Sequence, residues 1–245
     1  MNLFGDAFRW ILEPSHWTGP NGIPNRILEH LAYTGLTVLI ATLIAVALGL
    51  YIGHTGRFRG IAVSVTGAMR ALPTLGLLVY LAVLFGLGIQ FALIPTIIVL
   101  VVLAIPPLLA GAYSGVQSVD GRTVDAARSM GMTEWQILWK VEVPLALPLI
   151  LGGIRSAVLQ VVATATVAAY ISLGGLGRYI IDALPVRDYT TVLVGALLVT
   201  ILALVLDGIL ILCQRLTVPA GVRAIRSSPG QRSTTKSAST VSTAA

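Results

Sequence analysis

Charged residues are scarce in this chain. Of its 245 residues only 11% are Asp, Glu, Lys or Arg, whereas 56% are hydrophobic, and the mean hydropathy is +0.90. Soluble globular domains carry more charge and less apolar surface, so the composition predicts a membrane protein in contact with lipid. The net charge of +6 comes from Lys and Arg in short segments between apolar runs. Since no basic face is formed, a nucleic-acid partner is not expected.

Cysteine and the common catalytic motifs are also lacking. Cys213 is the only cysteine, which excludes an intrachain disulfide and a thiolate metal site built from this chain alone. The three histidines, His16, His30 and His54, are scattered, and the sequence has no HExxH, GxSxG or GxxxxGK[ST] pattern and no carboxylate cluster. We therefore expect no catalytic residue, no metal and no bound cofactor, which argues against a membrane enzyme.

Long charge-free runs predict an all-α protein that crosses the membrane five times. The first predicted span covers residues 31–53 and reaches roughly 35 Å as a helix, which is enough to cross the hydrocarbon core. Residues 71–119 are long enough for spans two and three. Their connection is predicted to be a tight loop at Gly86, Gly88 and Gln90.

Prolines and isolated charges mark the remaining spans. Pro73 is expected to kink span two, because proline lacks a donor and clashes with the preceding turn. Span four is predicted over residues 145–171 with a single charge, Arg155, and span five over about 190–214 with a single charge, Asp207. Five crossings place the two termini on opposite sides.

The positive-inside rule gives the orientation. One set of loops holds Arg57, Arg59, Arg122, Arg128, Lys140, Arg215, Arg223, Arg226, Arg232 and Lys236. The other set holds only Arg9, Arg26, Arg178 and Arg187. The first set is expected to be cytoplasmic, which predicts an external N-terminal segment (1–30), a transmembrane domain (31–215), a long inner loop at about 117–146 and an inner, disordered tail (216–245).

The long inner loop is predicted to form two short helices, and we call it the elbow. Asp120 caps the first helix, and Gly131 ends it in the left-handed region. Thr133 and Gln136 have the spacing of a capping box for the second helix. Pro144 is expected to stop that second helix.

The elbow resembles the EAA loop of ABC importer permeases, in which EAA is followed by three residues, G, nine residues, I, one residue and LP. The matching positions are Asp125, Ala126, Ala127, Gly131, Val141, Val143 and Pro144. The chain departs from the pattern by Asp for Glu and by Val for Ile and Leu, and the spacing is kept. The resemblance implies a coupling helix that docks in a groove of a separate ATPase subunit. It also implies that ATP and Mg²⁺ bind to that subunit. The alternative is a chance match of a short motif.

The residue types suit such docking. Ala126 and Ala127 have small side chains that allow a close approach to a partner, and Gly131 adopts a turn that a Cβ would strain. Asp125 is available to pair with a cation of the partner or with the helix dipole.

Three further segments resemble permeases for osmoprotectants such as glycine betaine, carnitine, choline and proline: residues 70–74 (RALPT), 153–157 (GIRSA) and 174–177 (GGLG). The resemblance covers residues 17–215 and implies the five-span type I importer permease (MetI-like) fold in the bacterial cytoplasmic membrane. It also implies a second permease subunit, identical or related, and an external solute-binding protein. A permease for methionine or another small solute is the alternative.

Two charges inside the spans and one aromatic residue are candidates for function. Arg155 is costly in the bilayer unless it is paired, and Asp207 or backbone carbonyls are its expected partners; the alternative is that it reaches the headgroups. Tyr170 is a candidate for lining a substrate path through cation–π attraction. An ion relay through Arg155 and Asp207 would instead favour a channel or a secondary transporter.

Overall fold

The structure is a computed structural model that describes residues 2–86 and 91–217. Over these ranges every regular element is helical. The α-helices are α1 (Leu3–Leu12), α2 (Ile23–Thr55), α3 (Arg59–Ala71), α4 (Thr74–Phe85), α5 (Leu93–Gln117), α6 (Gly121–Ser129), α7 (Glu134–Ile137), α8 (Val143–Thr164), α9 (Gly177–Ile181) and α10 (Tyr189–Thr217). The shorter turns are η1 (Pro14–Trp17), η3 (Leu138–Glu142) and η4 (Ala165–Ile171).

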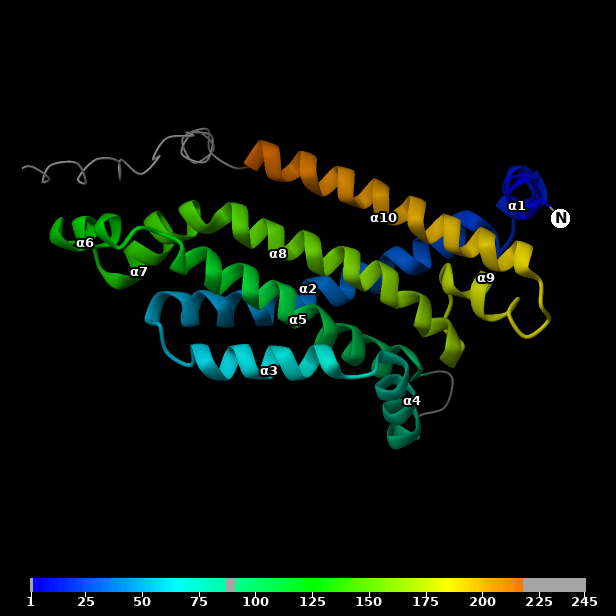
Figure 1. Ribbon diagram of the computed structural model, residues 1–245, viewed down its shortest axis with the longest axis horizontal. Coiled ribbons are helices and arrows are strands. Elements are labelled where there is room, and N and C mark those ends of the chain that lie inside the picture. The colour runs from blue at the N-terminus through cyan, green and yellow to red at the C-terminus, as the bar shows by residue number, and fades with distance from the viewer. Residues whose placement is uncertain (1, 87–90, 218–245) are drawn as a thin grey trace, which may run out of the picture.

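Four helical stretches are long and apolar enough to cross a membrane: α2, α5, the continuous stretch from α7 to η4, and α10. The pair α3 and α4 makes a fifth when it is taken together. These stretches run along the long axis of the molecule, except for α4, which turns away from it (Figure 1). The prediction of an all-α, five-span protein is confirmed.

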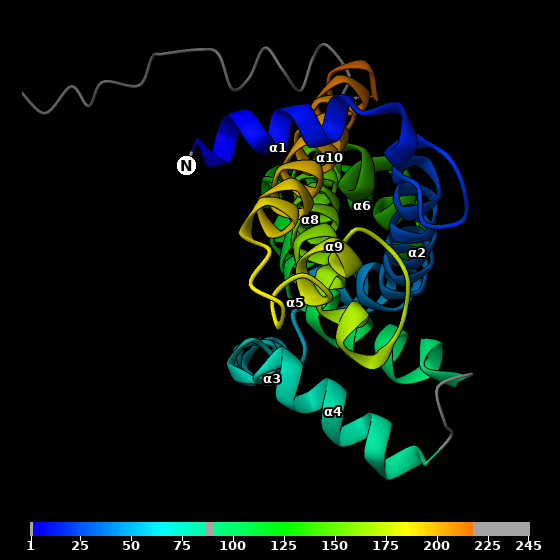
Figure 2. The ribbon, with the colours of Figure 1, turned by 90° about the vertical axis from the view of Figure 1, so that its right-hand side faces the viewer.

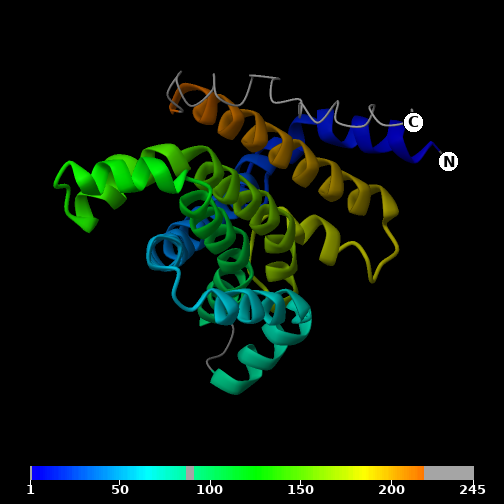
Figure 3. The same cartoon turned by 60° about the vertical axis from the view of Figure 1, so that its left-hand side comes forward.

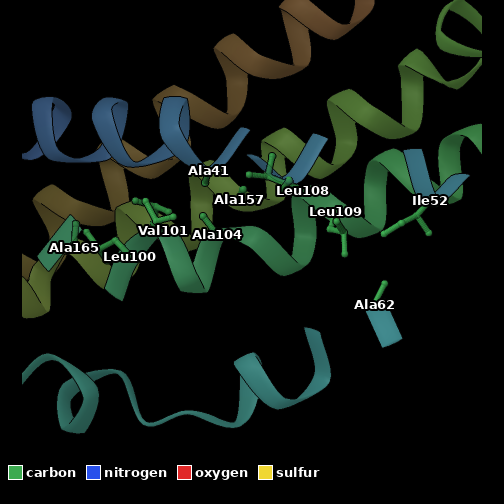
Figure 4. Close-up of a cluster of buried hydrophobic side chains, with 12 residues drawn as sticks. Ala41, Ile52, Ala62, Leu100, Val101, Ala104, Leu108, Leu109, Ala157 and Ala165 are labelled. Carbon is green, nitrogen blue, oxygen red and sulfur yellow. The ribbon is translucent and has the colours of Figure 1, made fainter. Parts of the chain in front are cut away.

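Helix α5 lies at the centre of the bundle. It packs against α2 and α8 along its length and against α3 and α4 on its outer side. The contacts use small side chains: Ala104 of α5 lies in the main core cluster with Ala41 of α2 and Ala157 of α8 (Figure 4). Helix α10 lies at the margin of this chain, because only 6% of its most apolar 18-residue segment is buried, whereas 56% of the corresponding segment of α5 is buried.

Glycines allow α5 and α8 to approach closely. A Cβ built on Gly111 of α5 would lie 2.8 Å from the Cα of Gly153 in α8, and one built on Gly153 would lie 2.8 Å from the carbonyl oxygen of Pro107. Pro107 also frees the carbonyl of Leu103, and the amide of Gln160 in α8 donates to it at 3.1 Å. The crossing therefore satisfies a backbone group that would be costly if it were left unpaired in lipid.

The first two spans differ from their predicted form. Helix α2 begins at Ile23 rather than at residue 31, because Pro24 fits the first turn of a helix, where no backbone donor is needed. At Pro73 the chain does not merely kink: α3 and α4 are separate helices bent by 86°. Gly86 ends α4 in the left-handed region, and the rest of the predicted loop, with Gly88 and Gln90, lies outside the described residues.

The two ends of the bundle are built differently. At one end, α6 and α7 project beyond the spans (Figure 3). At the other end, α9 lies beside the start of α10, and α1 crosses α10 at a steep angle (Figure 2). Helix α10 continues to Thr217, and residues 218–245, which make up most of the predicted tail, lie outside the described part of the chain.

Candidate functional site

The elbow begins with a helix whose two ends are determined by its own sequence. The Asp120 carboxylate accepts a hydrogen bond from the backbone N–H of Arg122 at 3.0 Å and caps α6. At the other end the N–H groups of Gly131 and Met132 donate to the carbonyls of Arg128 and Ala127. This is a Schellman motif, and it requires the left-handed conformation that Gly131 adopts, with φ at +83°. Both predicted helix ends are confirmed.

The second helix starts as predicted but does not stop at Pro144. Thr133 and Gln136 form a reciprocal capping box. The helix then widens into the π-helical turn η3, in which the N–H of Val143 donates to the carbonyl of Leu138. In a regular α-helix the ring of Pro144 would clash with the carbonyl four residues earlier, and the wider turn removes this conflict. The expectation that Pro144 ends the helix is therefore wrong: α7, η3 and α8 are continuous.

The motif residues of α6 face in two directions. Ala127 is buried against the chain's own elbow, whereas Asp125 and Ala126 are exposed. Of the two alanines, only Ala126 therefore offers a small side chain to a partner. Met130 extends the same exposed surface, with 76% of its area accessible. Val141, Val143 and Pro144 are partly buried where the elbow joins the bundle.

Charged side chains hold the two helices of the elbow together. Arg128 donates from Nε to one oxygen of Glu134 at 2.8 Å and from Nη2 to the other at 3.1 Å. Its Nη1 also donates to Asp125 at 3.0 Å. The hydrogen bonds to Glu134 raise the pKa of Arg128 above its usual value. A bidentate pair of this kind sets the angle between α6 and α7, although its exposure limits its contribution to stability.

Sequence reasoning did not find the contact that joins the elbow to α2. Nδ1 of His54, in the last turn of α2, lies 2.6 Å from a carboxylate oxygen of Glu142 in η3, and Nε2 lies 3.5 Å from Glu134. The Glu142 side chain is only 7% exposed and that of His54 only 16%. A signal was present, since Glu142 lies among residues that enter an apolar span and a buried carboxylate needs a partner.

Arg155 and Asp207 meet between α8 and α10. Nη2 of Arg155 donates to one carboxylate oxygen at 2.8 Å while Nε donates to the other. Arg155 lies about 18 Å along α8 from Val143, the first residue of that helix. The pairing neutralises both charges inside a span. Whether transport requires the pair stays a prediction.

Tyr170 and the glycine-rich loop (residues 174–177) lie at the end of the bundle opposite the elbow. Tyr170 is in η4 and exposes 55% of its surface, and its role in a substrate path stays a prediction. The loop that follows is attached to α2, since the N–H of Gly175 donates to Glu29 at 2.7 Å. The Tyr179 hydroxyl also donates to the carbonyl of Asn21 at 2.8 Å. These bonds hold the loop in one position above the spans.

Comparison with solved structures identifies the fold. The chain superimposes on a subunit of the MetNI methionine ABC transporter in an inward-facing conformation with a TM-score of 0.70. The aligned region covers 84% of this chain and 99% of the other, at 22% identity. The MetI-like permease fold expected from the elbow is therefore confirmed.

Comparison with characterised proteins identifies the family. The chain is 31% identical over 198 residues to the glycine betaine/carnitine/choline permease protein OpuCB of Bacillus subtilis, covering 81% of this chain and 89% of that one. It is 34% identical over 201 residues to the osmoprotectant import permease protein OsmW of Salmonella typhimurium, covering 80% and 91%. The family model described as "binding-protein-dependent transport system inner membrane component" matches residues 39–217. The chain therefore belongs to this family of transport-system membrane components.

Proposed function

We propose that this chain is the permease subunit of an ATP-driven importer that carries an osmoprotectant such as glycine betaine, carnitine, choline or proline. The observation that carries this proposal is the elbow: a rigid, exposed helix with the EAA-loop spacing, in a chain whose relatives are named as osmoprotectant permeases. The chain has no phosphate-binding loop, so ATP and Mg²⁺ bind to a separate ATPase subunit.

The proposed orientation places the elbow in the cytoplasm of a bacterium and the α9 end outside. Five basic residues lie in the elbow or in the segment that joins α2 to α3 at the same end of the bundle, which agrees with the positive-inside rule. They are Arg57, Arg59, Arg122, Arg128 and Lys140. The N-terminal segment is then external, the glycine-rich loop faces an external solute-binding protein, and residues 216–245 form the cytoplasmic tail. A second permease subunit, identical or related, completes the substrate path.

In the proposed cycle, α6 lies in a groove of the ATPase, with Asp125 and Ala126 at the contact. Closure of two ATPase subunits on ATP moves the two elbows. Because α7 continues without a break into α8, a displacement of the elbow turns α8 and, through the close crossing at Gly111 and Gly153, α5. The path then changes between inward and outward access.

The test is reconstitution with the ATPase and the binding protein in liposomes. We expect a loaded binding protein to stimulate ATP hydrolysis and to drive uptake of a radiolabelled osmoprotectant. Uptake of methionine or another amino acid in place of a betaine would correct the substrate and keep the mechanism. Uptake by this chain in the absence of ATPase would reject the proposal in favour of a secondary transporter.

A further inference from the structure

A polar contact crosses from the elbow to α2, far away in the sequence. His54 and Glu142 are separated by 88 positions and come within 2.6 Å. Glu142 is the last residue of the π turn that joins α7 to α8, and His54 lies one residue before the end of α2. The pair therefore connects the first membrane span to the point where the elbow enters the bundle.

Because this contact is buried, it stabilises one position of α2 relative to the elbow. Glu142 as a whole is only 5% exposed, and removing a partner from a buried carboxylate is strongly destabilising. The charged groups that pair with His54 are Glu142 and Glu134, with Arg128 and Asp125 bound on the far side of Glu134. The π turn η3 also carries Lys140, whose side chain is exposed. A shift of α2 relative to the elbow would separate His54 from both carboxylates.

The same residues form a continuous chain of charged contacts. Asp125 in the motif binds Arg128, Arg128 binds both oxygens of Glu134, and Glu134 lies 3.5 Å from His54. The backbone joins the elbow to α5 and α8, its two flanking helices, and Leu138 of η3 also packs in an apolar cluster with Leu50 of α2 and Val116 of α5. The contact at His54 adds a buried polar link between the elbow and α2 to this apolar packing.

We propose that the His54–Glu142 pair is a positioning contact that makes α2 move with the coupling helix. This inference rests on the proposed function, since it concerns how motion of the ATPase reaches the spans. Helix α2 packs along α5, so its movement together with the elbow keeps the α2–α5–α8 core intact while the path changes access. Without the pair, only apolar packing joins α2 to the elbow, so α2 no longer follows the elbow and ATP hydrolysis is no longer coupled to transport.

The experiment uses the complete transporter in liposomes and measures solute uptake per ATP hydrolysed. In the first variant His54→Leu and Glu142→Leu are combined, so that no charge is left buried without a partner. In the second, His54→Asn keeps a donor for the Glu142 carboxylate, because the asparagine amide nitrogen lies close to the position of Nδ1. The matched control combines His16→Leu with Glu13→Leu, which changes the same residue types in a pair 3.9 Å apart near the other end of the bundle.

We expect the double-leucine variant to bind the ATPase and hydrolyse ATP while uptake per ATP falls roughly tenfold, which corresponds to about 1.4 kcal/mol of lost coupling. His54→Asn is expected to keep most of the wild-type ratio, and the control to match wild type. If the double-leucine variant does not assemble, His54→Phe with Glu142→Gln is measured instead, with the same expectation.

An unchanged ratio in these variants, even at lower absolute rates, contradicts the inference, because a contact that only stabilises the fold lowers hydrolysis and uptake together. Failure of the wild-type complex to couple hydrolysis to uptake would instead contradict the proposed function. The two failures are therefore distinguishable in one experiment.

Discussion

At the scale of single residues, Gly131 is the position where local geometry is most demanding. Its φ of +83° belongs to the left-handed region, yet a Cβ at this position would meet no atom within 4 Å. A substitution therefore acts only through the backbone and not through a clash. Asparagine tolerates this region, alanine does so at a cost, and β-branched residues are strongly disfavoured.

We predict that coupling follows this order. Gly131→Asn should retain most of the ATP hydrolysis stimulated by the loaded binding protein, Gly131→Ala less, and Gly131→Val nearly none, while membrane insertion of all three is unchanged. The measurement is stimulated hydrolysis in the reconstituted complex, with insertion assessed by protein recovered from membranes. Normal coupling in Gly131→Val would show that the turn is not required.

Asp188 gives a pH-dependent contribution to stability. Its carboxylate accepts bonds from the hydroxyl of Thr191 at 2.6 Å and from the backbone N–H of Thr191 at 3.1 Å, at the start of α10. These bonds hold the pKa of Asp188 below its ordinary value of 3.8. Because the folded pKa is depressed, the stabilisation is complete above the unfolded value and is lost as the pH falls through the folded one.

We therefore predict that Asp188→Ala lowers the thermal stability of the purified protein at neutral pH, by about 0.5–2 kcal/mol for a lost N-cap. The difference between variant and wild type should shrink as the pH is lowered below 3.8. The measurement is the unfolding midpoint in detergent across this pH range. Asp182→Ala, in an exposed pair with Arg178, is the control.

At the scale of elements, the crossing of α5 and α8 depends on the absence of side chains at one face. Gly152 and Gly153 are neighbours in α8, but a Cβ on Gly153 would meet backbone at 2.8 Å, whereas one on Gly152 would meet nothing within 4 Å. We predict that Gly153→Leu separates the helices and costs about 1–3 kcal/mol or more, as overpacking does. Thermal unfolding midpoints of the two leucine variants test this, and equal midpoints for Gly152→Leu and Gly153→Leu would contradict the crossing.

At the scale of the whole molecule, the Arg155–Asp207 pair joins the marginal helix α10 to the core. Arg155→Ala leaves Asp207 without its partner inside a span, so we predict a loss of uptake of at least roughly tenfold. Arg155→Leu combined with Asp207→Leu removes both charges. Recovery of uptake in this double variant would assign the pair a structural role, and continued loss with normal assembly would assign it a role in transport. Normal uptake by Arg155→Ala would exclude any required role.

The sequence alone determined the features that depend on neighbours a few positions away. The apolar runs gave the number of spans, and the caps at Asp120 and Thr133 and the turn at Gly131 follow from bonds to residues within one or two helical turns. Such bonds do not depend on the rest of the chain, so their patterns can be recognised in advance.

Only the tertiary structure decided the contacts between distant segments. No local pattern determined the pairing of His54 with Glu142 or the choice of Asp207 as the partner of Arg155. The same holds for the 86° bend between α3 and α4 and for the continuation of the helix past Pro144. Each depends on contacts that form only when the helices pack into the bundle. A histidine at the end of a span has no recognisable partner in the sequence until the bundle brings a buried carboxylate within hydrogen-bonding distance.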